Sequence, residues 1–340
     1  MNFKPIYLIY FFCFFSCNST VKKNTDSNNH EGMIFIKGGE FIMGGNNKQA
    51  KQDEYPKHKV VVNSFWMDET EVTNSQFKKF IDATGYVTTA EKMIDWEEIK
   101  KIVPPGTLKP HDSLMAPASL VFFESNATNF NDYTQWWKLK RNANWKQPLG
   151  TGSNINDKDD HPVIHISWDD AMAFCRWAEK RLPTEAEFEY ASRGGFDNTI
   201  YSWGNEPIYK GNPKANTWEG KFPSNNKLSD KFYLSAPVKS FEPNPFGLYD
   251  IGGNVWEWCS DWYHSEYYQI ISDKTIQNPQ GPINSYDPME PYSPKRVMRG
   301  GSFLCNDSYC SGYRNSMRMK STPDSSSIHA GFRTVVDAKP

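Results

Sequence analysis

The pattern of apolar residues predicts short strands at the start of the folded chain. Apolar and polar positions alternate in the segment MIFIKGGEFIMGG, which begins at Met33, and again in HKVVVNSFWMDET. Alternation of this kind is typical of half-buried β-strands, and Gly38 and Gly39 predict a turn within the first segment. The β-branched residues Val163 and Ile164 predict a further short strand in HPVIHISW.

Three later segments have the spacing and the end signals of helices. In NSQFKKFIDATG the apolar residues recur at helical spacing, and Gly85 marks the end. Asp169 opens a second predicted helix in DDAMAFCRWAEKR. The third lies in PTEAEFEYASRGG, where Thr184 and Glu187 fit a capping box and Gly194 stops the helix.

The remaining chain predicts mostly loops and short strands. The region 96–158 is irregular, and so is nearly everything beyond Tyr201. Aromatic residues make up 15% of the chain, and Gly and Pro each number 22, which favours a loop-rich fold with an aromatic core. Because no internal repeat or linker is visible, we expect a single α+β domain over residues 32–336, with a tail at 337–340.

The N-terminus predicts export to the cell envelope. An apolar run at 6–15 is too short to span a bilayer but suits a signal peptide. It ends at Ser16 and Cys17, which resemble a bacterial lipobox, so we expect a signal peptide over residues 1–17, cleavage before Cys17 and lipid attachment to it. A polar tether over 18–31 would then anchor the domain to a membrane, in the periplasm or at the outer membrane. An uncleaved anchor and plain secretion stay open as alternatives.

The charge balance argues against a nucleic-acid partner. The chain has 38 basic and 40 acidic residues and a net charge of -2, so it lacks the excess of cations that a phosphate backbone requires. We expect a monomer.

The six cysteines do not form a disulfide framework. Cys175 has the helical spacing of a core residue, and Cys259 has no obvious partner. Cys305 and Cys310, in RGGSFLCNDSYCSGYRNSMR, could close a short disulfide, stay as inert thiols or bind a soft metal. Zinc needs two further ligands, so Cu(I) is the metal that this pair could hold alone.

His161 and His165 have a spacing that forms a metal site on a helix. Pro162 and the β-branched residues after it argue for a strand instead. We therefore interpret both histidines as structural.

Several clusters together resemble the formylglycine-generating enzyme (sulfatase-modifying factor) family. In chain order they are TEVTNSQFKKFIDATGY, HPVIHISWDDAMAFCRWAEKRLPTEAEFEYASRGG, GLYDIGGNVWEWCSDWY, RGGSFLCNDSYC and TPDSSSIHAGFR. The resemblance covers about residues 38–334, and the cysteine pair followed by TPDSSS and GFR is the pattern of the catalytically competent branch. It implies the loop-rich, C-type-lectin-like fold of that family.

The resemblance also implies an unusual oxidation. Such enzymes use O2 to convert a cysteine in a C-x-P-x-R segment of an unfolded sulfatase to Cα-formylglycine. By resemblance, Cys305 and Cys310 would hold Cu(I) as a nearly linear bis-thiolate that the substrate thiolate joins. Ser302 and Tyr309 would form hydrogen bonds around bound oxygen and substrate, and Trp256 would line the same cleft. Ordinary packing stays the alternative for these last three residues.

Two structural calcium sites are implied as well. The ligands of the first would be Asn216, the carbonyl of Thr217, Asp230 and the carbonyl of Phe232. The ligands of the second would be Asp250, the carbonyls of Gly253 and Val255, and Glu257. The family commonly has Asn where this chain has Asp250, and a carboxylate binds Ca²⁺ at least as well.

The chain departs from vertebrate-type members in its disulfides. Thr334 stands where the partner of Cys175 is expected, and Ser192 and Asn315 stand at the places of the second bridge. Two other functions stay open: a non-catalytic envelope lipoprotein on the same scaffold, and a related oxidase that acts on another thiol substrate.

Overall fold

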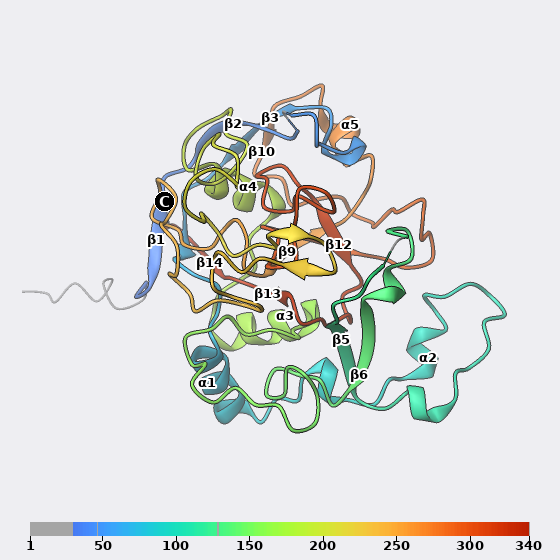
Figure 1. Ribbon diagram of the computed structural model, residues 1–340. Helices are drawn as coiled ribbons and strands as arrows, with labels where there is room; N and C mark the ends of the chain where they lie inside the picture. Colours follow the sequence, from blue (N-terminus) through green and yellow to red (C-terminus); the bar gives the residue numbers. More distant parts are fainter. Residues whose placement is uncertain (1–29, 46, 128, 340) are drawn as a thin grey trace, which may run out of the picture. The chain divides into compact units, whose positions relative to one another are not determined.

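The structure is a computed structural model that describes residues 30–339 except 46 and 128 (Figure 1). Its compact unit begins at Gly32. The predicted signal peptide with its lipid-attachment residue Cys17 lies outside the described residues, as does the predicted tether up to residue 29. None of the helices in the described part is both long and apolar enough to cross a membrane.

The strands of the described residues form three small sheets and two hairpins (Figure 1). The first sheet has the order β1 (Met33–Ile36), β4 (Phe65–Asp68), β14 (Val335–Asp337). The second has the order β10 (Ile276–Gln277), β3 (His58–Val62), β2 (Gly39–Met43), and the third β12 (Met319–Ser321), β11 (Arg296–Arg299), β9 (Trp256–Trp262), β13 (Ala330–Gly331). The hairpins are β5 (Ala118–Phe122) with β6 (Trp137–Arg141), and β7 (Gly220–Lys221) with β8 (Asn225–Asn226).

The turn predicted at Gly38 and Gly39 separates β1 from β2, which join different sheets. A Cβ atom at Gly38 would lie 2.4 Å from the backbone carbon of Asn63. Only glycine leaves room for the two chain segments to pass this closely.

The helices are short. They are α1 (Asn74–Thr84), α2 (Trp96–Ile99), α3 (Trp168–Trp177), α4 (Glu185–Arg193) and α5 (Tyr267–Ile271), with 3₁₀ turns η2 (Gln52–Glu54), η3 (Thr89–Glu91), η4 (Asp112–Leu114) and η5 (Tyr133–Gln135). The three predicted helices correspond to α1, α3 and α4. The N–H of Glu187 donates to the Thr184 hydroxyl at 3.1 Å, and Gly85 and Gly194 end their helices with left-handed φ angles of 67° and 62°. Helix α3 begins one residue earlier than predicted, because Ser167 is its N-cap.

Two expectations about strands are wrong. The segment HPVIHISW forms only an isolated bridge between Pro162 and Thr73, and His165 has a left-handed φ of 60°. Its backbone groups bond to separate partners, such as the carbonyls of Val72 and Ser327, rather than to one neighbouring strand. The region 96–158, predicted to be irregular, contains the β5–β6 hairpin, whose pairing was not visible because its loop is long.

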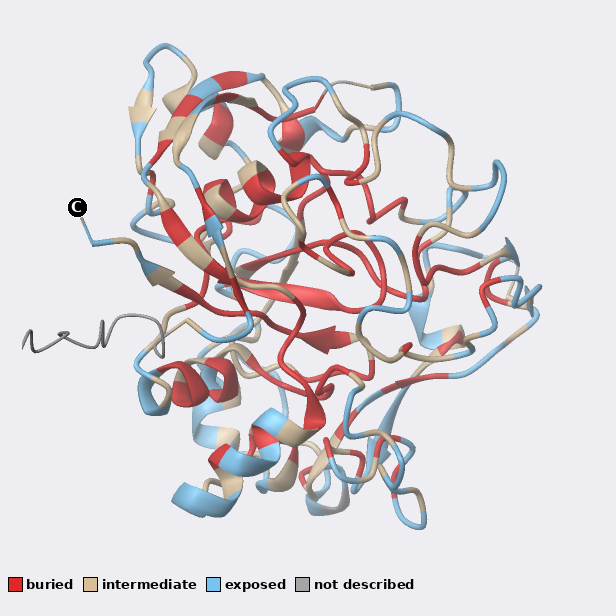
Figure 2. Ribbon diagram, turned by 90° about the vertical axis from the view of Figure 1, so that its left-hand side faces the viewer, coloured by how far each residue is buried: buried red, intermediate tan, exposed pale blue. Residues whose placement is uncertain are grey.

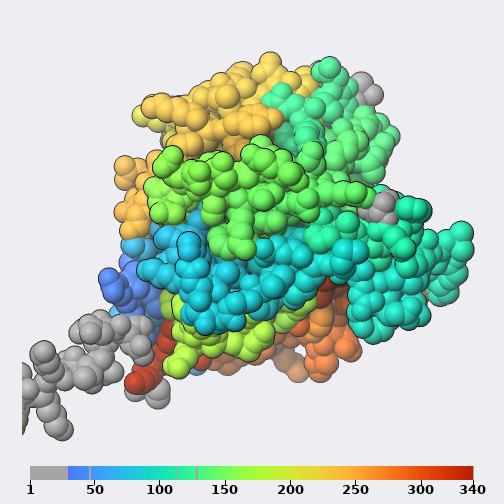
Figure 3. Space-filling view, turned by 90° about the horizontal axis from the view of Figure 1, so that it is seen from below, coloured from blue at the N-terminus to red at the C-terminus, as the bar shows by residue number. Residues whose placement is uncertain are grey.

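The core is aromatic, as the composition predicts. Phe77 of α1 packs against Phe80, Phe174 of α3 and Phe332, with ring centroids 5.4 to 6.4 Å apart. Buried positions continue through β9 and the loops around it (Figure 2). Figure 3 shows α1 beside the segment that leads to α3, where the N–H of Ser75 donates to the carbonyl of Asp159 at 3.0 Å.

Candidate functional site

The two candidate copper ligands lie on the loop that follows β11. A tight turn at Gly300 and Gly301, both with positive φ, turns the chain back from the sheet. A Cβ atom at Gly301 would lie 2.5 Å from the backbone nitrogen of Tyr313, so the start and the end of this loop pack directly on each other. The loop thereby brings Cys305 close to Gly312.

Cys305 and Cys310 are both free thiols, and each acts on the ionisation of the other. Cys305 is buried, whereas Cys310 is partly exposed. Burial, with the contact to Cys310, raises the pKa of the Cys305 thiol well above its usual value. Burial acts in the same direction on Cys310, but hydrogen bonds from Cys305 and from backbone N–H groups lower the pKa of its thiol below the usual value. Cys310 is thus the more acidic thiol of the pair, and Cys305 is the one that holds its proton more tightly.

Buried groups enclose the sulfur of Cys305. The backbone N–H of Ser302 donates to Cys305 Sγ at 3.3 Å, and the Ser302 hydroxyl lies 4.0 Å from the same atom. A Cβ atom at Gly312 would lie 2.5 Å from Cys305 Sγ and 2.5 Å from Cζ2 of Trp256. Ser302 and Trp256, both predicted site residues, therefore lie at the thiols.

Tyr309 forms part of an aromatic rim on the outer side of the loop. Its ring stacks on Phe222 at 4.2 Å with an interplanar angle of 11°, and meets the edge of Trp136 at 5.7 Å. Burial, together with the nearby Cys310, raises its pKa to about 12, so the hydroxyl keeps its proton at neutral pH. The side chain is 36% exposed, and it can donate a hydrogen bond to a group that approaches Cys310.

Asn306 anchors the short segment between the two cysteines. Its carbonyl accepts hydrogen bonds from the N–H groups of Cys310 and Ser311 at 3.0 and 2.9 Å. Its side-chain amide donates to the carbonyls of Trp218 and Gly220 at 3.0 and 3.1 Å. The cysteine loop is therefore tied to the segment that precedes the β7–β8 hairpin.

A cleft of about 420 Å³ opens along this same junction. Its walls come from Thr217 to Gly220 on one side and from Asn306 to Ser308 on the other, and Tyr209 and Tyr313 also line it. The cleft thus runs beside the segment that joins Cys305 to Cys310.

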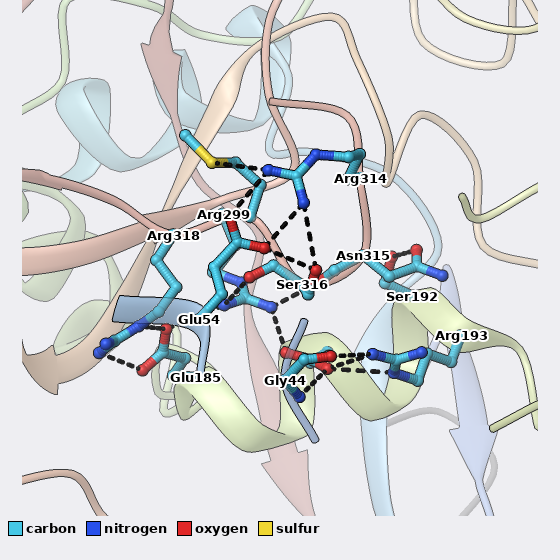
Figure 4. A network of polar contacts seen from close by, with 12 residues as sticks. Gly44, Glu54, Glu185, Ser192, Arg193, Arg299, Arg314, Asn315, Ser316 and Arg318 are labelled. Atoms are coloured by element: carbon cyan, nitrogen blue, oxygen red, sulfur yellow. Dashed lines mark hydrogen bonds and ion pairs between the residues drawn. The ribbon is translucent and has the colours of Figure 1, made fainter. Parts of the chain in front are cut away.

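A buried ion pair holds the far end of the loop. Both terminal nitrogens of Arg314 donate to Glu54, at 2.7 and 2.8 Å (Figure 4). The Nε of Arg314 donates to the hydroxyl of Ser311 at 3.0 Å. Both charged side chains are fully buried. Sequence reasoning missed Glu54 because it lies 260 residues before its partner.

The same region contains further buried ion pairs (Figure 4). Arg299 of β11 donates to Glu185 and Glu189 of α4 at 2.9 and 2.5 Å, and Arg318 donates to Glu185 at 2.7 Å. These pairs fix β11 and the strand after the loop to α4, so the cysteine loop is held at both ends.

At the first predicted calcium site, one buried oxygen has no hydrogen-bond partner. Asn216 Oδ1 is this atom, while its amide nitrogen donates to the carbonyl of Leu234 at 2.9 Å. Asp230 accepts hydrogen bonds from the N–H groups of Thr217 and Phe232 at 3.2 and 3.0 Å, and burial raises its pKa to about 6. The four predicted ligand residues thus lie together, and the unpaired amide oxygen fits a cation there.

At the second predicted calcium site, one of the two acids has an oxygen without a partner and the other does not. Asp250 Oδ1 is buried without a partner, while Oδ2 accepts a hydrogen bond from the N–H of Lys239 at 2.8 Å. Glu257 instead receives two hydrogen bonds from Arg333, at 2.6 and 2.9 Å. Within the described ranges, no three His, Cys, Asp or Glu side chains converge as a metal site. Carbonyl oxygens, such as those predicted at Gly253 and Val255, would have to complete the coordination.

The missing disulfides are replaced by polar contacts. The Ser192 hydroxyl donates to Asn315 Oδ1 at 2.6 Å, so the pair at the second bridge position still joins the same two segments. Thr334 donates to the carboxylate of Asp68, which also acts on the buried thiol of Cys175.

The two histidines are structural, as the sequence indicates. His165 is fully buried and bonds to the Ser119 hydroxyl at 2.8 Å and to the carbonyl of Pro148 at 2.9 Å. His161 contacts the Ser235 hydroxyl at 3.4 Å.

Comparison with solved structures supports the fold. The structure of PvdO from Pseudomonas aeruginosa superimposes with a TM-score of 0.58 at 21% sequence identity, covering 89% of this chain and 93% of the other. Treponema denticola variable protein 1 gives a TM-score of 0.53 at 20% identity, covering 89% and 94%. At this level of identity the likeness concerns the fold alone.

Sequence comparison identifies the family. A family model described as a sulfatase-modifying factor enzyme 1-like domain matches residues 18–338. The formylglycine-generating enzyme of Thermomonospora curvata is 42% identical over 310 residues, covering 90% of this chain and 94% of that one, and the Mus musculus enzyme is 42% identical over 91% and 76%. An inactive Cα-formylglycine-generating enzyme 2 of Mus musculus is 35% identical over 90% and 86%. The chain therefore belongs to the sulfatase-modifying factor (formylglycine-generating enzyme) family.

Proposed function

We propose that this protein oxidises a cysteine in C-x-P-x-R segments of unfolded sulfatases to Cα-formylglycine, with Cu(I) as cofactor and O2 as oxidant. Relatives with 42% identity over nine tenths of the chain bear the name of this activity. An inactive relative shares the scaffold, so family membership alone does not decide. The observation that carries the proposal is the pair of free thiols, Cys305 and Cys310, which act on each other's ionisation on a buried loop anchored at both ends.

The donor set fits a two-coordinate soft metal. Cys305 and Cys310 would hold Cu(I) through their sulfur atoms, and Cu(I) prefers such thiolate ligands. When bound, the metal would supply the one-electron chemistry with O2 that thiols alone lack. Cys310 is partly exposed, so it is at this side that a client thiolate can approach. The N–H of Ser302, which points at Cys305 Sγ, would stabilise negative charge on that sulfur.

The net reaction balances with an external reductant. The carbon–sulfur bond of the client cysteine breaks, sulfur leaves as sulfide, and the carbon gains an aldehyde oxygen. One C–H bond of the same carbon breaks as well. O2 accepts two electrons from this carbon and two from a pair of small thiols, which join as one disulfide, and its second oxygen leaves as water. Tyr309 keeps its phenolic proton and would donate a hydrogen bond to the approaching client or oxygen.

The test is mass spectrometry of a C-x-P-x-R peptide incubated in air with the Cu(I)-loaded protein and a thiol reductant. We expect the peptide to lose about 18 Da, the change from a cysteine to an aldehyde side chain. Cys305→Ser and Cys310→Ser should each abolish this loss and copper binding. Cys175→Ser, which removes a buried thiol elsewhere, is the matched control and should retain both.

Other results would redirect the assignment. An unchanged peptide with copper bound at Cys305 and Cys310 would indicate an oxidase for another thiol substrate. An unchanged peptide without bound copper would support a non-catalytic envelope lipoprotein. Full activity of Cys305→Ser would refute the proposed site.

We further propose that two structural calcium ions and an N-terminal lipid belong to the mature protein. Atomic emission should find two calcium ions per chain. Incorporation of labelled fatty acid that is lost in Cys17→Ser would support anchoring in the envelope, where the protein would meet exported sulfatases before they fold. Recovery of the unprocessed chain in the cytosol would contradict it.

A further inference from the structure

A buried acid that the sequence assignment did not include lies beside the second predicted calcium site. Glu71 is fully buried between β4 and α1. Its Oε1 accepts a hydrogen bond from the side-chain amide of Asn254 at 3.0 Å, whereas its Oε2 has no hydrogen-bond partner. A carboxylate oxygen left bare in the interior is costly unless a cation meets it or the group takes up a proton.

Asp250 has a second buried oxygen without a hydrogen-bond partner, and with Glu71 it forms a cluster of buried acids. Its side chain is only 8% exposed, Oδ1 has no partner, and its carboxylate interacts electrostatically with Glu71. The cluster therefore contains two buried carboxylates that act on each other, each with one oxygen unbonded.

Arg333 is the nearby cation, and its donors are already used. Its N–H groups donate to both oxygens of Glu257 and to the backbone carbonyls of Asp68, Glu69 and Tyr249. These five bonds account for all five N–H groups of a guanidinium. Arg333 cannot form a hydrogen bond with Glu71 or Asp250 without giving up one of them.

The remaining cations near the cluster have partners elsewhere. Lys239 gives Asp250 only its backbone N–H, since its ammonium group is paired with Glu69, and Lys180 is paired with Asp68. With its carboxyl groups ionised, the cluster has three carboxylates (Glu71, Asp250, Glu257) against one guanidinium, a net charge of -2. A divalent cation would cancel this charge.

We infer that Glu71 is a ligand of the calcium ion proposed at Asp250, with Oε2 as its donor atom and Asn254 as the residue that positions it. This inference rests on the proposed second calcium site and assigns it a residue not in the original set. Carboxylate oxygens are the hard ligands that Ca²⁺ prefers, and Glu71 and Asp250 are the two acids of the cluster with an oxygen to spare. Both oxygens of Glu257 accept hydrogen bonds from Arg333, so Glu257 orients the guanidinium of Arg333.

The test is calcium binding to the purified protein after removal of metal with a chelator, followed by isothermal titration calorimetry and measurement of the calcium-induced shift in Tm. We expect Glu71→Gln to lose one of the two calcium ions, or to bind it at least about tenfold more weakly. Glu69→Gln, two residues away and with its side chain turned to Lys239, is the matched control and should bind as the unaltered protein does.

Glutamine has the shape of a protonated glutamate, so the variant separates the two states of Glu71. If Glu71 is a neutral buried acid and no ligand, Glu71→Gln keeps both calcium ions and the full Tm shift, and the inference is overturned. Should Glu71→Gln not fold, Glu71→Asp keeps the charge but shortens the side chain, and unchanged calcium affinity there would overturn it too. Peptide oxidation is not measured in these experiments, so their outcome is independent of whether the proposed activity is found.

Discussion

The ion pair between Glu54 and Arg314 predicts a large and specific loss of stability in Glu54→Gln. The substitution keeps the shape of the side chain but leaves the buried guanidinium of Arg314 without its counter-charge. Each oxygen of the Glu54 carboxylate accepts a hydrogen bond from Arg314, at 2.7 and 2.8 Å. In glutamine one of these two oxygens becomes an amide nitrogen, which can only donate. Removal of one partner from a fully buried pair costs about 3–5 kcal/mol in the free energy of unfolding. This corresponds to a fall in Tm of roughly 5–15 °C.

The assay is thermal unfolding, with copper binding measured on the same samples. Glu40→Gln is the control, because Glu40 forms an ion pair of 2.8 Å with Lys59 in which both side chains are about half exposed. Such a surface pair contributes about 1 kcal/mol or less, so its Tm should hardly move. Because Arg314 also holds Ser311, next to Cys310, we expect Glu54→Gln to weaken copper binding even at temperatures where the protein stays folded.

Acid unfolding adds an independent signature. Burial raises the pKa of Glu54, but the hydrogen bonds and charge of Arg314, with hydrogen bonds from Lys51 and Ser316, together lower it below its usual 4.5. A lowered pKa means that the pair contributes fully above about pH 4.5, and that this contribution is lost as the pH falls through the folded-state value. The stability of Glu54→Gln should lack this acid-dependent part. If Glu54→Gln and Glu40→Gln had equal Tm values and equal acid profiles, the reasoning from burial and charge would be refuted.

Three further predictions follow from the geometry. Gly312→Ala places a methyl group 2.5 Å from Cys305 Sγ and from Trp256. We expect this overpacking to cost about 1–3 kcal/mol in the free energy of unfolding and to weaken copper binding at least about tenfold, measured by calorimetry. An unchanged copper affinity would show that the loop can move to accommodate the methyl group. Chelation of calcium should lower Tm, and calcium added back at about 100 times its Kd should restore about 2.7 kcal/mol per site; a Tm indifferent to chelator would contradict both sites. Burial raises the pKa of Asp261 to about 7, so the folded state binds its proton more tightly than the unfolded state, and this group should make the protein less stable as the pH rises from about 4 to 7; Asp261→Asn should flatten this slope in urea unfolding.

The sequence predicted the parts of the fold that local signals specify. Helices α1 and α4 have their caps and stop glycines within a dozen residues, so their existence and ends could be read directly. The cysteine pair was found because both thiols sit on one short loop. The family resemblance assigned Ser302 and Trp256 to the same site, and both residues lie beside Cys305, while their roles stay predictions.

What could not be predicted depends on pairings between distant segments. The β5–β6 hairpin closes across a long loop, and the segment around His165 turns left-handed at that residue and pairs only through one isolated bridge, so neither follows from alternation. The partner of Arg314 lies near the N-terminus of the domain. In the sequence Glu71 looks like an ordinary acid before a helix. Only the structure shows that one of its oxygens has no hydrogen-bond partner and that the N–H groups of Arg333 are already used.

The bond between Glu54 and Arg314 also sets an order of events during biogenesis. Glu54 is synthesised first, and Arg314 follows 260 residues later. Domains fold as units, so the thiol loop, held by this pair at one end, cannot assume its final form until Arg314 has left the ribosome. A chain that stops between Cys310 and Arg314 would thus carry both cysteines without a formed site, and the site becomes competent only after Arg314 has been added.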